Sequence, residues 1–202
     1  MKKLIVEFIG TFFLVLVVAL SGNPVAIGVI LTAMVYMGGY ISGAHYNPAV
    51  TIGLWVSGKV KSGDVWVYIV AQLLGGLAAA GIYAYIKHGL FLPAPAAGVS
   101  WFTAFLVEAL FTFALVSVVH HVAATDKTKG NQYYGLAIGM TLLAAATAGG
   151  PISGGAFNPA VGVSPLLFDI TGISSHMANI LLYIAGPLTG GILAGLLYKN
   201  LK

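Results

Sequence analysis

Two asparagines, each followed by proline and alanine, are the residues best suited to chemistry in this otherwise apolar sequence. The segments SGAHYNPAV (42–50) and SGGAFNPAV (153–161) share six of nine positions. Asn suits the cap position before a helix and Pro suits its first turn. The tripeptides Asn47–Pro48–Ala49 and Asn158–Pro159–Ala160 therefore predict two helix N-termini. If each side-chain oxygen accepts a backbone N–H, each amide NH2 remains as a pair of donors for a small solute that has an oxygen lone pair.

The chain around these asparagines has the composition of a membrane protein. Hydrophobic residues make up 59% of the 202 residues, and only nine basic and five acidic side chains are present. A water-soluble domain has about a quarter of its residues charged, so lipid must solvate this surface. A spanning helix needs about 20 apolar residues. Six segments approach that length, namely 4–21, 25–41, 65–86, 101–122, 132–149 and 177–198. We therefore predict an all-α membrane protein.

The sequence forms one transmembrane domain, 1–202, made of two related halves, about 1–98 and 99–202. EFIGTFFLV (7–15) recurs as EALFTFALV at 108–116. Because Glu interrupts the first apolar run and the segment recurs, we expect a retained helix there rather than a signal peptide. Each half contains three spans, an odd number, so the second half starts on the opposite membrane face. The halves are therefore predicted to form an inverted repeat, which places a shared site near the midplane.

The segments after the two tripeptides, 48–57 and 159–168, are too short to cross the membrane. Ten helical residues cover about 15 Å, half of the hydrocarbon core. Two re-entrant half-helices that enter from opposite faces can meet tip to tip. Irregular backbone at that depth is tolerated only when it is buried in protein or lines a water-filled cavity. We therefore predict a pore, where the positive ends of both half-helix dipoles oppose cations and the amide donors interrupt a proton-conducting chain of waters.

The lysines predict the orientation of the chain. With six spans, one face receives eight lysines and the other face receives only Lys87; the eight are Lys2, Lys3, Lys59, Lys61, Lys127, Lys129, Lys199 and Lys202. Basic residues accumulate on the cytoplasmic face, so we expect both termini to be cytoplasmic. The pI near 9.3 then reflects topology, and we infer no nucleic-acid partner. No cofactor or metal is expected, because cysteine is absent and the five histidines are scattered.

The sequence resembles the aquaporin (major intrinsic protein) family over essentially its whole length. The motifs that carry the resemblance are EFIGTFFLV, GAHYNPAVTIG, AQLLGG, ATDK and GGAFNPAV, with Pro165 after the last of them. The resemblance implies a homotetramer in which each protomer has its own pore. It also implies passive conduction of water or small neutral solutes, with no enzymatic activity. The compact loops favour a plasma-membrane location.

One position departs from the pattern of that family. Its members usually carry arginine immediately after the second Asn-Pro-Ala, where this chain has Val161, and the chain contains no arginine at all. With three other side chains, that arginine forms the narrow outer selectivity filter. By spacing from the tripeptides, the other three filter positions correspond to Ile27, Ala146 and Gly155. The resemblance therefore implies a wide, apolar filter in this protein.

A wide apolar filter predicts easier passage for solutes that are bulkier or less polar than water. Wide filters with Val at this position resemble those of some plant vacuolar members of the family, and this resemblance makes ammonia, urea and peroxide candidates. Glycerol stays possible but is not assigned, because the glycerol-conducting branch has Asp directly after the filter arginine and this chain has Gly162. The alternative is a plain water-selective channel in which Val161 is a tolerated change. Two other classes are considered, a secondary transporter, which needs ionisable midplane residues, and a poorly conducting structural membrane protein, which long extramembrane segments would favour.

Three further residues are assigned to the support of the re-entrant loops. Glu7 and Glu108 lie in apolar helices at equivalent places in the two halves, where an acidic group is costly. We expect them to accept hydrogen bonds from loop N–H groups rather than to line a proton path. His45 is expected to form a structural hydrogen bond with loop backbone rather than to gate the pore with pH. No role is assigned to His88, His120 and His121, which are expected to be solvated at helix ends.

Overall fold

The computed structural model describes residues 1–201, and within that range the regular structure is entirely helical. Six long helices are apolar enough to span a membrane: α1 (Lys2–Ser21), α2 (Pro24–Ser42), α4 (Ser62–Lys87), α5 (Trp101–Ala123), α6 (Tyr134–Ser153) and α8 (Ile173–Asn200). Two short helices, α3 (Pro48–Val56) and α7 (Pro159–Phe168), and a 3-10 turn, η1 (Asp126–Thr128), complete the fold. The all-α membrane fold predicted from the sequence is confirmed.

The predicted spans match the six long helices with end points that differ by at most four residues. The largest differences are at the end of α6 and the start of α8. The prediction stopped the fifth span at residue 149, but α6 continues through Pro151 to Ser153. A proline inside a helix removes one hydrogen bond and bends the helix without necessarily ending it. Lys202, which was predicted to be cytoplasmic, lies outside the described residues.

Local sequence signals set where the short helices begin and where their preceding helices end. The side chains of Asn47 and Asn158 cap α3 and α7, and a proline occupies the first helical position of each. The preceding helices α2 and α6 end at Gly43 and Gly154, both with φ of 90°. Glycine tolerates this left-handed conformation because it has no Cβ. The chain can therefore leave each long helix abruptly and turn back into the protein.

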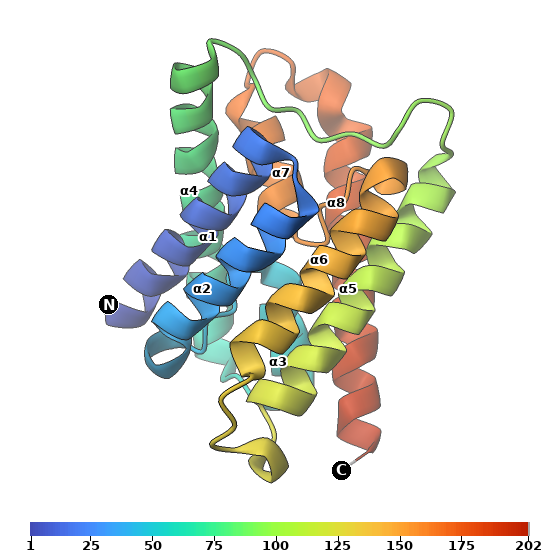
Figure 1. The fold of residues 1–202 in the computed structure, drawn as a ribbon. Coiled ribbons are helices and arrows are strands. Elements are labelled where there is room, and N and C mark those ends of the chain that lie inside the picture. Colours follow the sequence, from blue (N-terminus) through green and yellow to red (C-terminus); the bar gives the residue numbers. More distant parts are fainter. Residues whose placement is uncertain (202) are drawn as a thin grey trace.

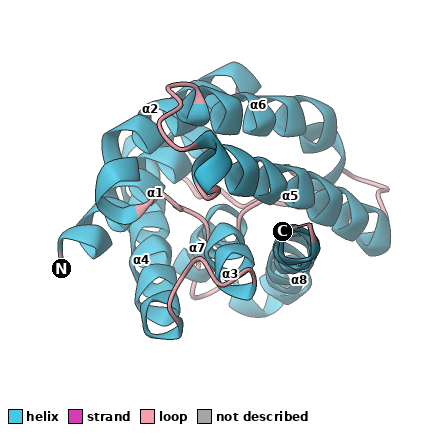
Figure 2. Ribbon diagram, turned by 90° about the horizontal axis from the view of Figure 1, so that it is seen from below, coloured by secondary structure: helices cyan, strands magenta, loops and turns pink. Residues whose placement is uncertain are grey.

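The long helices surround α3 and α7, whose N-terminal ends approach each other inside the bundle (Figures 1 and 2). The short helix of each half packs against a long helix of the other half, because α3 lies on α8 and α7 lies on α4. Nine and ten helical residues extend about 14 and 15 Å. Together the two short helices are long enough to cross the apolar thickness once. The halves are thus interlocked rather than placed side by side.

Two glycines permit the close packing of the short helices. A Cβ added at Gly76 of α4 would lie 2.9 Å from the carbonyl oxygen of Ala160, and one added at Gly191 of α8 would collide with the carbonyl oxygen of Ala49. These carbonyls belong to the two Asn-Pro-Ala tripeptides. Small residues allow helix backbones to approach closely in membranes. The glycines at equivalent places in α4 and α8 therefore set the depth at which both tripeptides are held.

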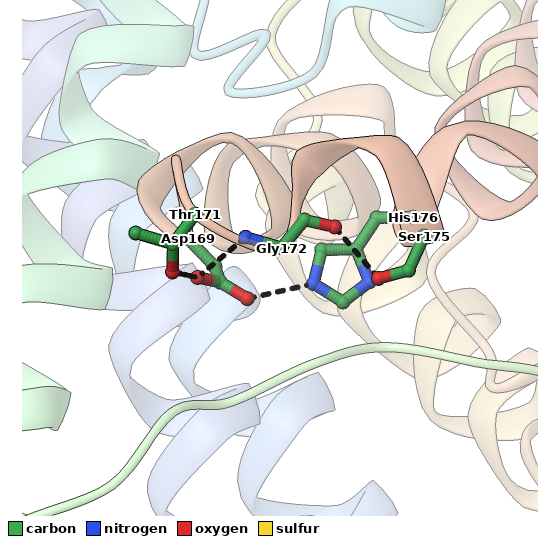
Figure 3. A network of polar contacts seen from close by, with 5 residues as sticks. All are labelled: Asp169, Thr171, Gly172, Ser175 and His176. Atoms are coloured by element: carbon green, nitrogen blue, oxygen red, sulfur yellow. Dashed lines mark hydrogen bonds and ion pairs between the residues drawn. The ribbon is translucent and has the colours of Figure 1, made fainter.

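The connection from α7 to α8 is fixed by a cluster of polar contacts, and Figure 3 shows it in detail. The Asp169 carboxylate accepts hydrogen bonds from the Thr171 hydroxyl at 2.9 Å and from the Gly172 N–H at 3.1 Å. Its second oxygen lies 2.9 Å from Nε2 of His176. The hydroxyl of Ser175 donates to the Gly172 carbonyl at 2.7 Å. This cluster ties the end of α7 to the first turns of α8.

An extended segment, residues 88–100, joins α4 to α5 and runs across one end of the bundle (Figure 1). Pro93 of this segment is buried. The Ala96 N–H donates to the carbonyl of Ile152 at 3.0 Å, near the end of α6. The segment therefore rests on the point where the chain turns inward toward the second tripeptide.

Candidate functional site

The two asparagines cap their own helices and also hold the opposite loop. The side-chain oxygen of Asn47 accepts the Ala49 N–H at 2.8 Å, and that of Asn158 accepts the Ala160 N–H at 2.9 Å. The Asn47 amide nitrogen donates to the Phe157 carbonyl at 2.9 Å, and the Asn158 amide nitrogen donates to the Tyr46 carbonyl at the same distance. These crossed contacts join the two short helices at their N-terminal tips.

The predicted pair of free amide donors at each asparagine is therefore wrong. An asparagine amide has two N–H groups, and the structure uses one of them on the opposite loop. One N–H per asparagine is left over. The reason is that each loop presents a carbonyl to the other, which the repeat in the sequence does not reveal. The helix dipoles still add about half a positive charge at each of the two tips.

A buried carboxylate shapes the first loop. One Glu7 oxygen accepts the Ser42 hydroxyl at 2.7 Å and the His45 N–H at 3.0 Å. The other oxygen accepts the Tyr46 N–H at 2.7 Å and the Gln72 amide at 2.8 Å. The side chain is fully buried. With four donors, this acidic group satisfies the loop backbone, which would otherwise be left unpaired inside the protein.

Glu108 has the same role in the second loop with one partner fewer. Its first oxygen accepts the Ser153 hydroxyl at 2.7 Å and the Ala156 N–H at 3.0 Å, and its second oxygen accepts the Phe157 N–H at 2.6 Å. It is also fully buried. The structure thus places both glutamates against loop N–H groups and away from the cavity wall described below.

Each loop has a non-glycine residue in the left-handed region directly before its asparagine, and the first loop has a second one, Ala44, with φ of 51°. Tyr46 has φ of 50° and Phe157 has φ of 48°, and each directly precedes a capping asparagine. Such conformations cost free energy and persist only where the surroundings impose them. The glutamate contacts to the N–H groups of these same residues supply that constraint. The strain is located at the point where the carbonyls are turned toward the opposite asparagine.

The predicted partner of His45 differs from the observed one. Its Nδ1 lies 3.1 Å from the Thr51 hydroxyl of α3 rather than against loop backbone. The Gln72 amide also donates to that hydroxyl at 3.0 Å, and the hydroxyl itself bonds the Asn47 carbonyl at 3.1 Å. The sequence could not reveal this contact, because it depends on the first turn of α3 folding back over the loop. His45 is thereby held by a helix side chain.

The surroundings of His120 differ from those predicted from the sequence. It was expected to be solvated, but it is fully buried, with Nδ1 2.8 Å from the Val116 carbonyl and Nε2 2.9 Å from the Ser57 hydroxyl. Ser57 directly follows the last residue of α3. Because the end of α3 lies beside the last turns of α5, the His120 side chain contacts Ser57 instead of solvent. His88 and His121 are exposed, as expected.

An internal cavity of about 20 Å³ lies at the meeting point of the two short helices. Its wall includes Asn47 and Asn158 together with three of the four predicted filter residues, Ile27, Gly155 and Val161. The fourth, Ala146, is buried but does not belong to that wall. His45 belongs to it as well. The volume corresponds to room for about one water molecule.

The cavity wall repeats itself across the two halves. Its sixteen residues form eight pairs of equivalent positions, and six pairs are identical, namely Leu14/Leu115, Val18/Val119, Ile27/Ile138, Leu31/Leu142, Asn47/Asn158 and Val50/Val161. The other two pairs are Ala44/Gly155 and His45/Ala156. Most of these residues were not predicted from the sequence, although the register of the internal repeat locates the second member of each pair once the first is known. Val161 thus matches Val50, the residue after the first tripeptide.

Comparison with known proteins supports the resemblance to the aquaporin family over nearly the whole chain. Residues 1–198 match the profile of the family described as major intrinsic protein. This chain belongs to the major intrinsic protein family. Aquaporin AqpM from Methanothermobacter thermautotrophicus is 36% identical, over 99% of this chain and 97% of that protein. The Glycerol uptake facilitator protein-like 6 of Lactiplantibacillus plantarum is 34% identical, over 96% of this chain and 95% of that protein.

A third relative and one solved structure extend the comparison. Aquaporin TIP2-1 of Arabidopsis thaliana is 41% identical over 86% of this chain and 68% of that protein. The fold resembles the X-ray structure of the aquaglyceroporin from Plasmodium falciparum, with a TM-score of 0.84, 21% identity, and coverage of 98% of this chain and 95% of that one. Six apolar helices and this family membership make the protein an integral membrane protein.

Proposed function

We propose that this major intrinsic protein conducts uncharged solutes, including ones larger than water, through a filter formed by Ile27, Ala146, Gly155 and Val161. The chain is a passive channel for water and small solutes. The finer assignment concerns ammonia, urea and peroxide, with glycerol possible. Its support is chemical, because a filter of these four residue types has no side-chain donor and no fixed charge to select for water.

One observation carries the proposal. Both capping asparagines and three of the filter residues line a single cavity in which the wall contains no lysine, aspartate or glutamate. Water and small amides or amines can exchange hydrogen bonds there with the remaining amide N–H groups of Asn47 and Asn158 and with backbone carbonyls. Val161 occupies the place where an arginine would narrow the passage.

A plain water-selective channel is the second candidate, and the cavity volume favours it. A volume of about 20 Å³ admits about one water molecule at a time. Urea or glycerol would require the leucine and valine side chains of the wall to move apart. The two candidates therefore differ in whether this apolar wall yields to a larger solute.

The finer points of membrane context are also part of the proposal. We infer cytoplasmic termini from the lysine distribution, a plasma-membrane location from the compact loops, and a homotetramer from the family resemblance. The inverted repeat of about 1–98 and 99–202 is supported by the paired residues of the cavity wall. A secondary transporter would need ionisable groups at the cavity. His45 is the one titratable residue in the described wall, so passive conduction without chemical turnover fits better.

The test is stopped-flow measurement on proteoliposomes that contain the purified protein, with empty liposomes as the baseline. Water efflux and the uptake of ammonia, urea and glycerol are measured on the native chain. A plugging variant, Val161→Trp, is expected to reduce every flux to the baseline, because the indole fills a cavity of this size. Leu110→Trp is the matched control, since Leu110 is 63% exposed on the outer surface of α5.

The outcomes separate the candidates. Ammonia or urea flux above the baseline, lost in Val161→Trp and kept in Leu110→Trp, supports the wide filter. Water flux alone, with the same response to the two variants, supports the water-selective channel. Flux that survives Val161→Trp would mean that solutes take another path, and this would contradict the site.

A further inference from the structure

The wall of the pore cavity contains no fixed positive charge. None of its sixteen residues is lysine, and the sequence contains no arginine. The two short-helix dipoles supply only partial positive charge at the centre. Within the cavity, cations are opposed by these dipoles and by the cost of losing their hydration in an apolar passage. Any fixed charge that opposes them must therefore lie outside the cavity.

A hollow of about 460 Å³ adjoins the cavity at the end of the bundle where the chain begins. We name it the lysine vestibule, because Lys3, Lys59, Lys61 and Asp64 are its charged lining residues. It shares His45 and Val119 with the pore cavity. A second hollow shares Ala44, Val119 and Ile138 with the cavity. The lysine vestibule is therefore one of two hollows into which a solute can leave the cavity at this end.

The lysine vestibule carries a net positive charge. Its three lysines outnumber its one aspartate, which gives a net charge of +2. None of the three lysines forms an ion pair with another residue of the described range 1–201. The ammonium of Lys59 lies 5.8 Å from the centre of the Tyr198 ring, and both residues also line a third hollow. A neighbouring hollow contains one lysine and one aspartate, Lys129 and Asp126, and so adds no net charge.

We propose that Lys3, Lys59 and Lys61 form the electrostatic barrier that keeps cations out of this pore, in place of the missing filter arginine. The proposal rests on the proposed function, since it assumes conduction through the cavity. A charged hollow with low-dielectric walls focuses its field on the passage it surrounds. The lysines then lower the local concentration of cations such as K⁺ or ammonium, while water and neutral solutes are unaffected.

The expected effect depends on salt. Interactions between charges separated by more than the Debye length are screened, and that length is about 30 Å at 0.01 M and about 3 Å at 1 M ionic strength. Rejection by the lysines is therefore strong in dilute solution and weak in concentrated salt. Rejection by dipoles buried at the centre of the pore would change much less with salt. This difference distinguishes the two barriers.

The experiment measures K⁺ leak and water efflux in the same proteoliposomes, with a voltage-sensitive dye and light scattering. The test variant is Lys3→Gln/Lys59→Gln/Lys61→Gln. The matched control is Lys2→Gln/Lys127→Gln/Lys199→Gln, which removes three lysines that do not line the vestibule. We expect the test variant to raise the ratio of K⁺ leak to water flux by roughly three- to tenfold at 0.01 M salt. The control is expected to remain at the native ratio.

Two further variants test the sign of the effect. Replacement of the three lysines by arginine keeps the charge and is expected to keep the native ratio. Asp64→Asn removes the negative charge of the vestibule. When it is added to the test variant, we expect the combined variant to leak less K⁺ than the test variant alone. These variants also answer the objection that the glutamine variant is merely less stable.

Several results would overturn the proposal. They are a K⁺ leak that stays at the level of empty liposomes in the test variant, an equal rise in the control, or a rise that is the same at 0.01 and 1 M salt. A change confined to chloride leak would also overturn it. If the native protein shows no water flux above that of empty liposomes, the proposed conduction path is refuted. This failure is distinguishable from a failure of the lysine barrier, because water flux and K⁺ leak are recorded in the same proteoliposomes.

Discussion

The two re-entrant loops, residues 43–47 and 154–158, follow almost the same path with different side chains. Each begins at a glycine with φ of 90° and ends at a capping asparagine. In each, a buried glutamate accepts two loop N–H groups and a serine hydroxyl. A tyrosine hydroxyl also donates to the carbonyl of that serine, at 2.8 Å in both halves.

The side chains around the loops differ. The first loop has His45, Thr51 and Gln72 joined by hydrogen bonds. At the equivalent places the second half has Ala156, Gly162 and Pro187. We infer that the backbone conformation of each loop depends on the glutamate and the asparagine. The hydrogen bonds among His45, Thr51 and Gln72 are found only in the first half.

Replacement of the glutamates is expected to have the largest effect on the stability of the two loops. Glu7→Ala and Glu108→Ala leave buried N–H groups without acceptors, at a cost of about 1–3 kcal/mol for each group. We expect about 4–6 kcal/mol of lost unfolding free energy for Glu7→Ala and slightly less for Glu108→Ala, because Glu7 also binds Gln72. Thermal unfolding in detergent measures both. Equal losses would mean that the Gln72 contact adds nothing.

Replacement of the glycines that pack against the tripeptides is expected to have the second largest effect on stability. Gly76→Ala and Gly191→Ala push a methyl group toward the carbonyls of Ala160 and Ala49, and overpacking costs about 1–3 kcal/mol. Water flux is expected to fall in both variants as the short helices are displaced. Gly150→Ala is the control, because nothing lies within 4 Å of the added methyl. If all three variants behave alike, the close approach is not what positions the tripeptides.

The polar contacts found only in the first half are expected to matter less. Thr51→Val removes the hydroxyl that contacts His45, Gln72 and the Asn47 carbonyl. A net hydrogen bond contributes about 0.5–1.5 kcal/mol, so we expect a loss of about 1–2 kcal/mol, measured by thermal unfolding. The second half lacks this hydroxyl and still forms its loop. Collapse of the Thr51→Val protein would show that the first loop depends on side chains that its counterpart does without.

The smallest effect is expected outside the bundle, at the connection after α7. The hydrogen bond with His176, and then those from Thr171 and Gly172, hold the pKa of Asp169 below its ordinary value. A lowered carboxyl pKa stabilises the fold above the unfolded-state pKa, and that contribution is lost as pH falls through the lowered value. The melting temperature of Asp169→Asn should therefore depend less on pH in the acid range than that of the native protein. Identical pH profiles would contradict the assignment.

The fold followed from the sequence because its signals are local and strong. The six apolar runs, the two Asn-Pro-Ala tripeptides and the glycines that end α2 and α6 each act within a few residues. Contacts between distant elements did not follow. The bond between His45 and Thr51, the burial of His120 against Ser57 and the use of each asparagine amide on the opposite loop all require the two halves to be interlocked.

The candidate site followed from the sequence in part. Asn47 and Asn158 of the tripeptides and the predicted filter residues Ile27, Gly155 and Val161 line one cavity, whereas Ala146 does not. Counting from a motif gives the position of a residue along a helix but not the direction in which its side chain points. The paired residues Leu14/Leu115 and Leu31/Leu142 went unnoticed because leucine in an apolar helix carries no chemical signal of its own.

We propose that Val161, which matches Val50 of the first half in the cavity wall, leaves the pore open to solutes other than water. The most direct test compares native protein, Val161→Arg and Val161→Met in stopped-flow measurements of water, ammonia and urea flux. We predict that the native protein passes ammonia or urea, that Val161→Arg passes water only, and that Val161→Met falls between them. A native protein that passes water alone, with Val161→Arg behaving the same way, would contradict the account and make this a plain water channel.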